Sequence, residues 1–143
     1  MQDRVTDLVL EVFRLNGDLI AMGDALVADL HLSSARWQVM GAIALAEMPL
    51  PIAQIARNMG LTRQAVQRVA NELEAEGFVR FAPNPDHQRA KLVLLTAKGQ
   101  AAYASAMRRW QTKAKSLGNG MSERSLKQAL VLLRQMRARL SPK

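Results

Sequence analysis

The sequence predicts a mainly helical fold with one small β-hairpin. Apolar residues recur at spacings of three and four over most of the 143 residues, which is the period of an amphipathic helix. Between the helical segments, FVRFA (78–82) and KLVLL (91–95) are rich in strand-forming residues. The eight residues that join them, PNPDHQRA, are typical of turns, so we expect an antiparallel hairpin.

Composition excludes several classes of protein. The chain contains no cysteine, which rules out disulfides, thiolate metal sites and cysteine redox switches. No apolar run reaches the roughly 18 residues that a membrane-spanning helix needs, and the first residues lack the pattern of a signal peptide. The length suits one domain, with or without helical extensions. We expect a cytoplasmic protein with no membrane contact.

Charge is distributed unevenly along the chain. Residues 1–56 carry three Arg against seven acids, residues 57–115 carry eleven Lys or Arg against four acids, and residues 116–143 carry six against one. The net charge of +8 therefore comes from the region after residue 56, where it could neutralise phosphates. The alternative is a solvated basic surface with no partner.

The first element is a helix over about residues 3–29. Its apolar stripe has heptad-like spacing and consists of Val5, Leu8, Val12, Leu15, Leu19, Met22 and Leu26. The stripe faces either the core of its own chain or a second copy, and the sequence leaves both open.

A second helix is expected over residues 35–48. Ser33 or Ser34 provides its N-cap, and Pro49 ends it. Its expected packing face consists of Trp37, Met40, Gly41 and Ala44.

A short third helix, PIAQIARNMG, follows Leu50, for which we expect a single β-bridge. Pro51 suits the first helical position, and Gly60 supplies a tight turn at the end. The packing stripe consists of Ile52, Ile55, Ala56 and Met59.

The fourth helix, LTRQAVQRVANELEAEG (61–77), has two distinct faces. Thr62 is a good N-cap and Gly77 a good helix stop. The packing face consists of Val66, Val69, Ala70 and Leu73, and the opposite face of Gln64, Gln67, Arg68 and Asn71. Gln and Asn suit adenine and Arg suits guanine. Such a helix, placed after a short helix and a tight turn, is typical of the recognition half of a helix-turn-helix.

Two further helices are expected after the hairpin. Thr96 caps a long helix whose stripe consists of Tyr103, Met107, Trp110, Ala114 and Leu117. Residues 118–120 break it, and Ser122 caps a last helix with the stripe Leu126, Ala129, Leu133, Met136 and Leu140. We expect the first and last helices to pack together and against a second copy, which gives a two-fold dimer.

Two segments resemble the MarR family of bacterial winged-helix regulators. IAQIARNMGLTRQAVQRVANELEAEGFVRF is similar to the family's helix-turn-helix, and PDHQRAKLVLLTAKG is similar to its wing followed by Leu-Thr-x-x-Gly. The resemblance covers about residues 50–100, and the flanking helices fit in length and order. It implies an N-terminal dimerisation helix (1–30), a winged helix-turn-helix DNA-binding domain (31–100), and a long helix with a C-terminal dimerisation helix (101–143).

The resemblance further implies a homodimer on duplex DNA, with each recognition helix in a major groove and each wing near a minor groove. Asp86 and Arg89 match the acid and the Arg of the family's wing, where the acid braces the Arg. Two residues rather than the usual one separate them here, so His87 or Gln88 is expected to share the role at the tip.

We predict DNA contacts from the fourth helix and the wing. Arg63 meets phosphate, and Gln64, Gln67 and Arg68 reach bases, each good base contact contributing ~1–3 kcal/mol of discrimination. Arg89 suits a narrow, A·T-rich minor groove. The full predicted set is Arg57, Arg63, Gln64, Gln67, Arg68, Asn71, His87, Arg89 and Lys91. The alternative is a polar helix face and a wing tip that are merely solvated.

A small aromatic or anionic effector, bound between the dimer helices and the winged domain, is also implied by the resemblance. The residues expected around it are Phe13, His31, Arg36, Trp37 and Met40. The alternative is that Trp37 and Met40 are ordinary core residues.

Catalysis and metal binding have no support in the sequence. The two histidines, His31 and His87, lie in different loops. No Ser/His/Asp set, paired carboxylates or phosphate-binding glycine loop occurs at a useful spacing. We expect no enzymatic activity, no metal and no cofactor.

We therefore predict a dimeric, sequence-specific double-stranded DNA-binding transcription regulator with a pseudo-palindromic operator. We expect it to be a repressor that a small-molecule effector releases. The alternatives are a repressor that acts without an effector and a winged-helix protein-interaction module. RNA binding ranks below these, because the aromatic residues fall mostly on apolar stripes rather than on an exposed stacking surface.

Overall fold

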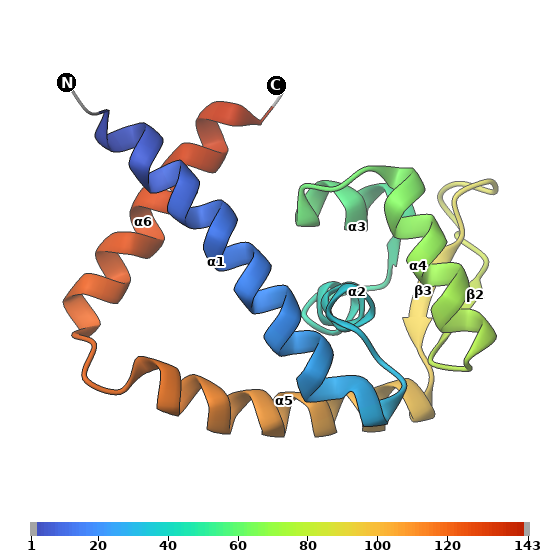
Figure 1. Cartoon of the computed structure of the whole chain (residues 1–143). Coiled ribbons are helices and arrows are strands. Elements are labelled where there is room, and N and C mark those ends of the chain that lie inside the picture. Colours follow the sequence, from blue (N-terminus) through green and yellow to red (C-terminus); the bar gives the residue numbers. More distant parts are fainter. Residues whose placement is uncertain (1–2, 142–143) are drawn as a thin grey trace. The chain divides into compact units, whose positions relative to one another are not determined.

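The computed structural model describes residues 3–141 and is mainly helical with one small antiparallel sheet, which confirms the predicted fold class. The elements are α1 (Arg4–Val27), the 3₁₀-helix η1 (Ala28–Leu30), α2 (Ser34–Ala44), β1 (Leu50–Pro51), α3 (Ile52–Met59), α4 (Arg63–Ala75), β2 (Val79–Ala82), β3 (Leu92–Leu95), α5 (Ala97–Gly118) and α6 (Glu123–Leu140) (Figure 1). The chain forms two compact units, one ending at Trp110 and the other starting at Gln111. No helix within the described residues is long and apolar enough to cross a membrane.

Helix α4 presents its apolar face to the core of the first unit. The four residues of the predicted packing face, Val66, Val69, Ala70 and Leu73, are all buried. Thr62 caps the helix, because its side chain accepts a hydrogen bond from the Ala65 amide at 3.1 Å. Helices α2 and α3, the sheet and the residue before β2 pack into the same core. They contribute Val39, Met40, Ile55, Ala56, Phe78, Val79 and Val93. The polar face of α4 is consequently left toward solvent.

The sheet has the strand order β1-β3-β2, with both pairs antiparallel. In the hairpin, Val79 pairs with Leu95 and Ala82 with Leu92. The expected single bridge at Leu50 is a two-residue strand instead, because Pro51 also pairs, with Leu92. Pro51 is therefore not the first residue of α3 but its extended N-cap. A proline is tolerated there because an edge strand can do without its missing N–H.

Helix α2 is shorter than predicted and packs through part of the predicted face together with Val39. It begins with Ser33 as its N-cap, as expected, but ends at Ala44 rather than at residue 48. Pro49 disfavours helical backbone in the residue before it, and the chain must already extend to bring Leu50 into the sheet. Of the predicted face, Met40 is buried and Trp37 packs against the core, whereas Ala44 is exposed. Val39, which is not part of that face, is also buried.

The apolar stripe of α1 is half-buried at Leu8, Met22 and Leu26 and is exposed at its other four positions. Gly23 and Val27 are buried where the helix meets α2. Toward the other end, Val5 is 62% and Leu15 is 52% exposed. The last turns of α1 therefore contact the core through Leu26 and Val27, and most of the stripe is left exposed.

The start of α5 approaches β2 through small residues. Thr96 caps the helix as predicted, its Oγ1 accepting from the Gly99 amide at 3.0 Å. The buried positions of α5 are Gly99 and Ala106, whereas Tyr103, which we expected in the packing stripe, is half-buried. A Cβ atom at Gly99 would overlap the carbonyl oxygen of Phe78. The contact between the start of α5 and the backbone just before β2 therefore depends on the absence of a side chain at Gly99.

Helix α6 lies in the second unit and begins where the sequence predicts. Ser122 accepts a hydrogen bond from the Ser125 amide at 3.0 Å and so caps it. None of the described residues of α6 is buried. Its exposed large apolar residues are Leu126, Leu130, Val131, Leu132, Leu133 and Leu140.

An ion pair between Asp29 of η1 and Arg109 of α5 predicts acid-sensitive stability. The two terminal guanidinium nitrogens of Arg109, Nη1 and Nη2, donate to the two carboxylate oxygens of Asp29. The Nη2–Oδ2 distance is 3.0 Å. The hydrogen bonds from Arg109 lower the pKa of Asp29 below 3.8. The stabilisation is therefore present above pH 3.8 and is lost as the pH falls through the lower pKa of the folded state.

We expect Asp29→Asn to reduce the free energy of unfolding at neutral pH. The difference from wild type should shrink as the pH falls through the pKa of Asp29 in the folded protein. Urea titrations over a pH series measure this difference. Asp18→Asn, at an exposed position on α1, is the control. A difference that does not change with pH would contradict the prediction.

Candidate nucleic-acid interface

A tight turn between α3 and α4 sets the direction of α4. Gly60 adopts the left-handed conformation with φ of 69°, which favours glycine. The Leu61 amide donates to the Ala56 carbonyl oxygen at 3.0 Å and closes the end of α3. With Thr62 as the N-cap, α4 begins at Arg63. The five predicted contact residues on this helix therefore occupy its first three turns.

The polar face of α4 lines a groove of about 990 Å³. The start of α3 and the end of the hairpin connection complete it. The lining residues are Pro51, Ile52, Ala53, Arg63, Gln64, Gln67, Arg68, Asn71, Glu72, Phe81, Arg89, Ala90 and Lys91. Four basic residues and one acid therefore surround this groove, which makes it an electropositive concave surface.

Seven of the nine predicted DNA-contact residues lie in this one groove. Five come from α4, and Arg89 and Lys91 come from the hairpin. Arg57 and His87 are exposed and are not among the lining residues. Arg57 instead donates to Gln54 Oε1 on its own helix at 2.7 Å.

Two amide side chains on α4 hydrogen-bond each other. Gln67 Nε2 donates to Asn71 Oδ1 at 2.9 Å, one helical turn away. The bond restricts the rotamers of both side chains, so they lose less conformational entropy if they engage a ligand.

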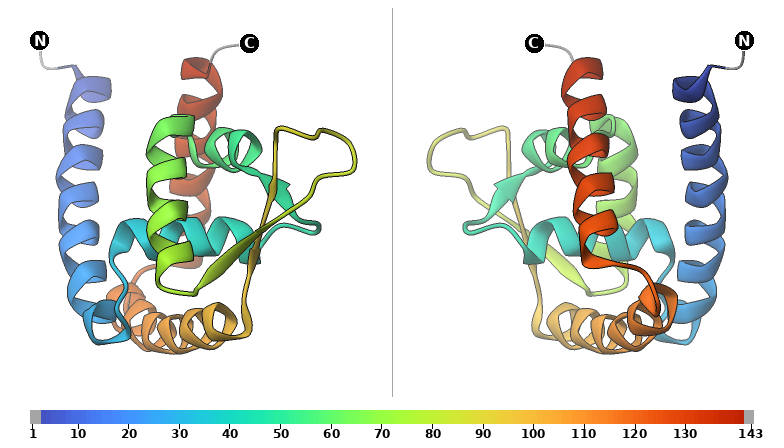
Figure 2. Two further views of the ribbon diagram at one scale, coloured as in Figure 1. Left: turned by 90° about the vertical axis from the view of Figure 1, so that its right-hand side faces the viewer. Right: turned by 90° about the vertical axis from the view of Figure 1, so that its left-hand side faces the viewer.

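The hairpin connection projects away from the helices of this unit (Figure 2). Asn84 closes it from both sides: its Nδ2 donates to the Ala90 carbonyl oxygen at 2.9 Å, and its Oδ1 accepts from the Asp86 amide at 3.0 Å. Asp86 and Arg89 form no ion pair within residues 3–141. The bracing that the resemblance implied is therefore absent, and Asn84 holds the backbone next to Arg89 instead.

The residues expected around an effector lie on α1, at the end of η1 and on α2. Phe13 is 68% exposed on α1, and His31 is a left-handed residue at the end of η1. Met40 is fully buried, and the Trp37 ring packs edge-on against Trp110 at 6.4 Å between centroids. These positions support the alternative that Trp37 and Met40 are core residues. The described residues contain no group of three or more His, Cys, Asp or Glu that could hold a metal ion.

Sequence reasoning missed six lining residues of the groove and the role of Asn84 next to it. The six are Pro51, Ile52, Ala53, Glu72, Phe81 and Ala90. Asn84 could have been found, since an Asn before Pro in a turn commonly bonds its own backbone two residues on. Nothing in the sequence marked Glu72, because its partner Arg36 comes from a different helix.

A helix-turn-helix whose second helix shares a basic groove with a β-hairpin defines a winged helix-turn-helix protein. Residues 31–90 match the sequence model of the MarR family. The uncharacterized proteins Rv2011c of Mycobacterium tuberculosis and Mb2034c of Mycobacterium bovis are each 39% identical over 100 residues, which is 70% of this chain and 68% of theirs. The chain belongs to the MarR family.

Two solved structures share the fold of this chain. The transcriptional regulator BldR from Sulfolobus solfataricus superposes with a TM-score of 0.86 at 20% identity, covering 98% of this chain and all of that one. CouR from Rhodococcus jostii RHA1, solved with p-coumaroyl-CoA bound, has a TM-score of 0.84 at 18% identity and full coverage of both chains. At these identities the likeness extends to the fold alone.

Proposed function

We propose that this chain is a dimeric transcriptional repressor that binds a pseudo-palindromic DNA operator through the groove between α4 and the hairpin. The observation that carries the proposal is the shared groove, in which the polar face of α4 meets Arg89 and Lys91 of the hairpin. Amide and guanidinium groups match base edges, and basic side chains match phosphates. The protein would act in the cytoplasm by covering a promoter.

In this proposal each part of the groove has its own role. Helix α4 enters the major groove, where Gln64, Gln67 and Arg68 read base edges and Arg63 binds phosphate. The hairpin acts as the wing and directs Arg89 toward the adjacent minor groove, whose negative potential is strongest where A·T pairs narrow it.

Exposed apolar stripes support a homodimer. On α1, Val5, Val12, Leu15 and Leu19 are exposed, and on α6 so are Leu126, Leu133 and Leu140. Exposed apolar stripes of this kind mark protein interfaces. A two-fold dimer would place two copies of α4 on half-sites about one helical turn apart. Sedimentation equilibrium of the purified chain measures the oligomeric state directly.

Selection of duplexes from a random DNA pool tests the proposed function. The bound fraction is sequenced after several rounds, and an enriched inverted repeat with half-sites about 10 bp apart is the expected result. Affinity for the selected duplex should fall steeply with salt, because phosphate contacts release counterions. Bulk binding without enrichment would contradict operator recognition and would favour the protein-interaction module.

Replacing Arg89 with Ala tests the role of the wing. We expect weaker binding to the selected duplex with little change in the sequence preference of the major-groove positions, because Arg89 is expected to contact the minor groove only. Repeating the duplex selection with the variant measures affinity and preference together. Unchanged affinity would contradict the assignment of the wing.

The proposal includes release of the DNA by an effector. CouR was solved with p-coumaroyl-CoA, and by analogy a small aromatic or anionic compound could bind near Phe13, His31 and Arg36 and change the spacing of the two recognition helices. A repressor without an effector is the second candidate, favoured by the burial of Met40 and the packing of Trp37. Screening compounds for release of the selected duplex separates the two.

A further inference from the structure

One carboxylate lies among the basic side chains of the groove. Glu72 of α4 lines it together with Arg63, Arg68, Arg89 and Lys91, and its side chain is 42% exposed. A DNA backbone in this groove would approach a negative charge at Glu72, and like charges in an interface weaken association. The sequence of α4 alone therefore does not produce a uniformly attractive surface.

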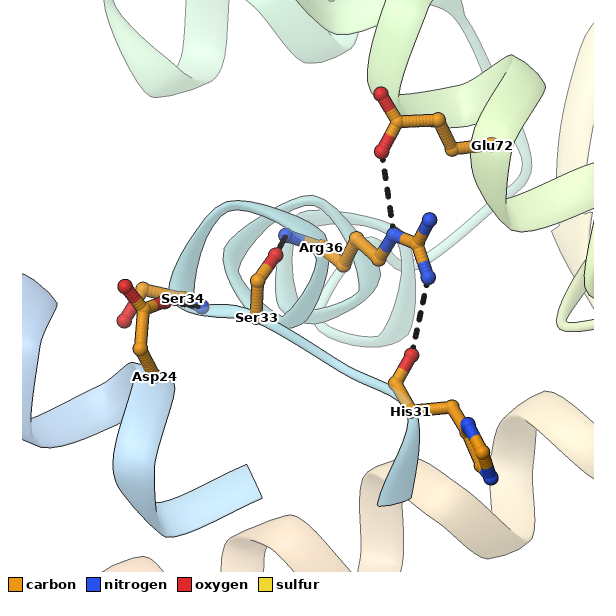
Figure 3. Close-up of polar contacts among 6 residues, drawn as sticks. All are labelled: Asp24, His31, Ser33, Ser34, Arg36 and Glu72. Carbon is orange, nitrogen blue, oxygen red and sulfur yellow. Dashed lines mark hydrogen bonds and ion pairs between the residues drawn. The ribbon is translucent and has the colours of Figure 1, made fainter. Parts of the chain in front are cut away.

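Arg36 of α2 compensates this charge. Its Nε lies 3.2 Å from Glu72 Oε1, and its Nη1 donates to the His31 carbonyl oxygen at 3.0 Å (Figure 3). The Arg36 side chain is only 23% exposed, so solvent and salt screen the pair less than a surface ion pair. Arg36 is not among the residues that line the groove, so it acts on the groove through Glu72.

The backbone that carries Arg36 is anchored. Ser33 Oγ accepts from the Arg36 amide at 3.2 Å. The next residue, Ser34, is buried; its amide donates to Asp24 Oδ1 at 2.7 Å and its hydroxyl to the Ile20 carbonyl oxygen at 2.8 Å. These bonds tie the first turn of α2 to α1, and Figure 3 shows the Asp24 and Ser34 side chains at this junction. The guanidinium of Arg36 is thus held in place before any DNA arrives.

We propose that Arg36 is a positioning residue for DNA binding, which holds the Glu72 carboxylate and cancels its charge so that the groove attracts phosphate. This inference rests on the proposed function. It assigns Arg36 an ion-pair partner within the chain, which is separate from the effector contact proposed above. It also makes the affinity of α4 for DNA depend on a residue that does not touch the DNA.

A double-mutant cycle tests the inference. Wild type, Arg36→Ala, Glu72→Gln and the double variant are titrated with the selected duplex by fluorescence anisotropy at low and high salt. We expect Arg36→Ala to bind about tenfold more weakly at low salt, the effect of one uncompensated charge, and the loss to shrink at high salt. Glu72→Gln is expected to bind at least as tightly as wild type, and the double variant to recover wild-type affinity.

Recovery in the double variant separates charge compensation from a merely structural role, which would leave it as weak as Arg36→Ala. Glu74→Gln, an exposed α4 carboxylate outside the groove lining, is the control for removing an acid. Arg36→Lys keeps the charge and is expected to retain most of the affinity. If Arg36→Ala fails to fold, Arg36→Gln replaces it in the cycle.

Two results would overturn the inference alone: equal affinity of wild type and the Arg36 variant, or no recovery in the double variant. Wild type that binds no selected duplex would overturn the proposed function, and this inference with it. The wild-type titration thus distinguishes the two failures.

Discussion

Replacing Gln67 and Arg68 together with Ala is expected to abolish selective DNA binding. Both side chains lie in the groove, and two base contacts of ~1–3 kcal/mol each correspond to roughly 30-fold to 10⁴-fold in affinity for the selected duplex. Binding to random duplex should weaken far less, because Arg63, Arg89 and Lys91 remain to contact phosphate. The measurement is the ratio of affinities for selected and scrambled duplexes.

Helix α3 offers a matched control. Gln54 and Arg57 are the same residue types, three apart and hydrogen-bonded to each other at 2.7 Å, but neither lines the groove. Replacing both with Ala is expected to lower affinity similarly for all sequences, as loss of a phosphate contact would. If the α4 variant keeps its sequence preference while the α3 variant loses it, α4 is not the helix that reads the bases.

Gly99→Ala is expected to destabilise the fold by about 3 kcal/mol or more, toward the upper end for overpacking. The new Cβ would overlap the Phe78 carbonyl oxygen, and a backbone atom cannot move aside by changing rotamer. That oxygen also accepts a hydrogen bond from the Thr96 amide at 3.0 Å, so a shift of α5 would disturb its cap. Urea denaturation and thermal unfolding measure the loss.

The control for this substitution is Gly118→Ala. A Cβ at Gly118 meets nothing within 4 Å among the described residues, so unchanged or slightly increased stability is expected, since Ala restricts the unfolded chain more than Gly. Equal stability of the two variants would show that α5 does not approach β2 as closely as the structure places it.

Features with short-range causes were predictable from the sequence. The two faces of α4 follow from helical periodicity, and the caps at Thr62, Thr96 and Ser122 follow from side chains that bond amides three residues on. The hairpin follows from two strand-forming runs joined by turn residues, and its strands begin within one residue of the expected positions. Seven of the contact residues predicted from these elements lie in one groove, although their binding to DNA stays a prediction.

The sequence by itself thus determined the order and type of the elements and which face of α4 is polar, because these depend on neighbours within one or two turns. The tertiary structure alone decided where α2 ends, how Gly99 lets α5 approach β2, and how Asn84 replaces the expected wing brace. It also decided the Arg36–Glu72 pair, whose members are 36 residues apart. Such contacts depend on how separate elements pack against one another, and no periodicity or capping rule within a single segment encodes that arrangement.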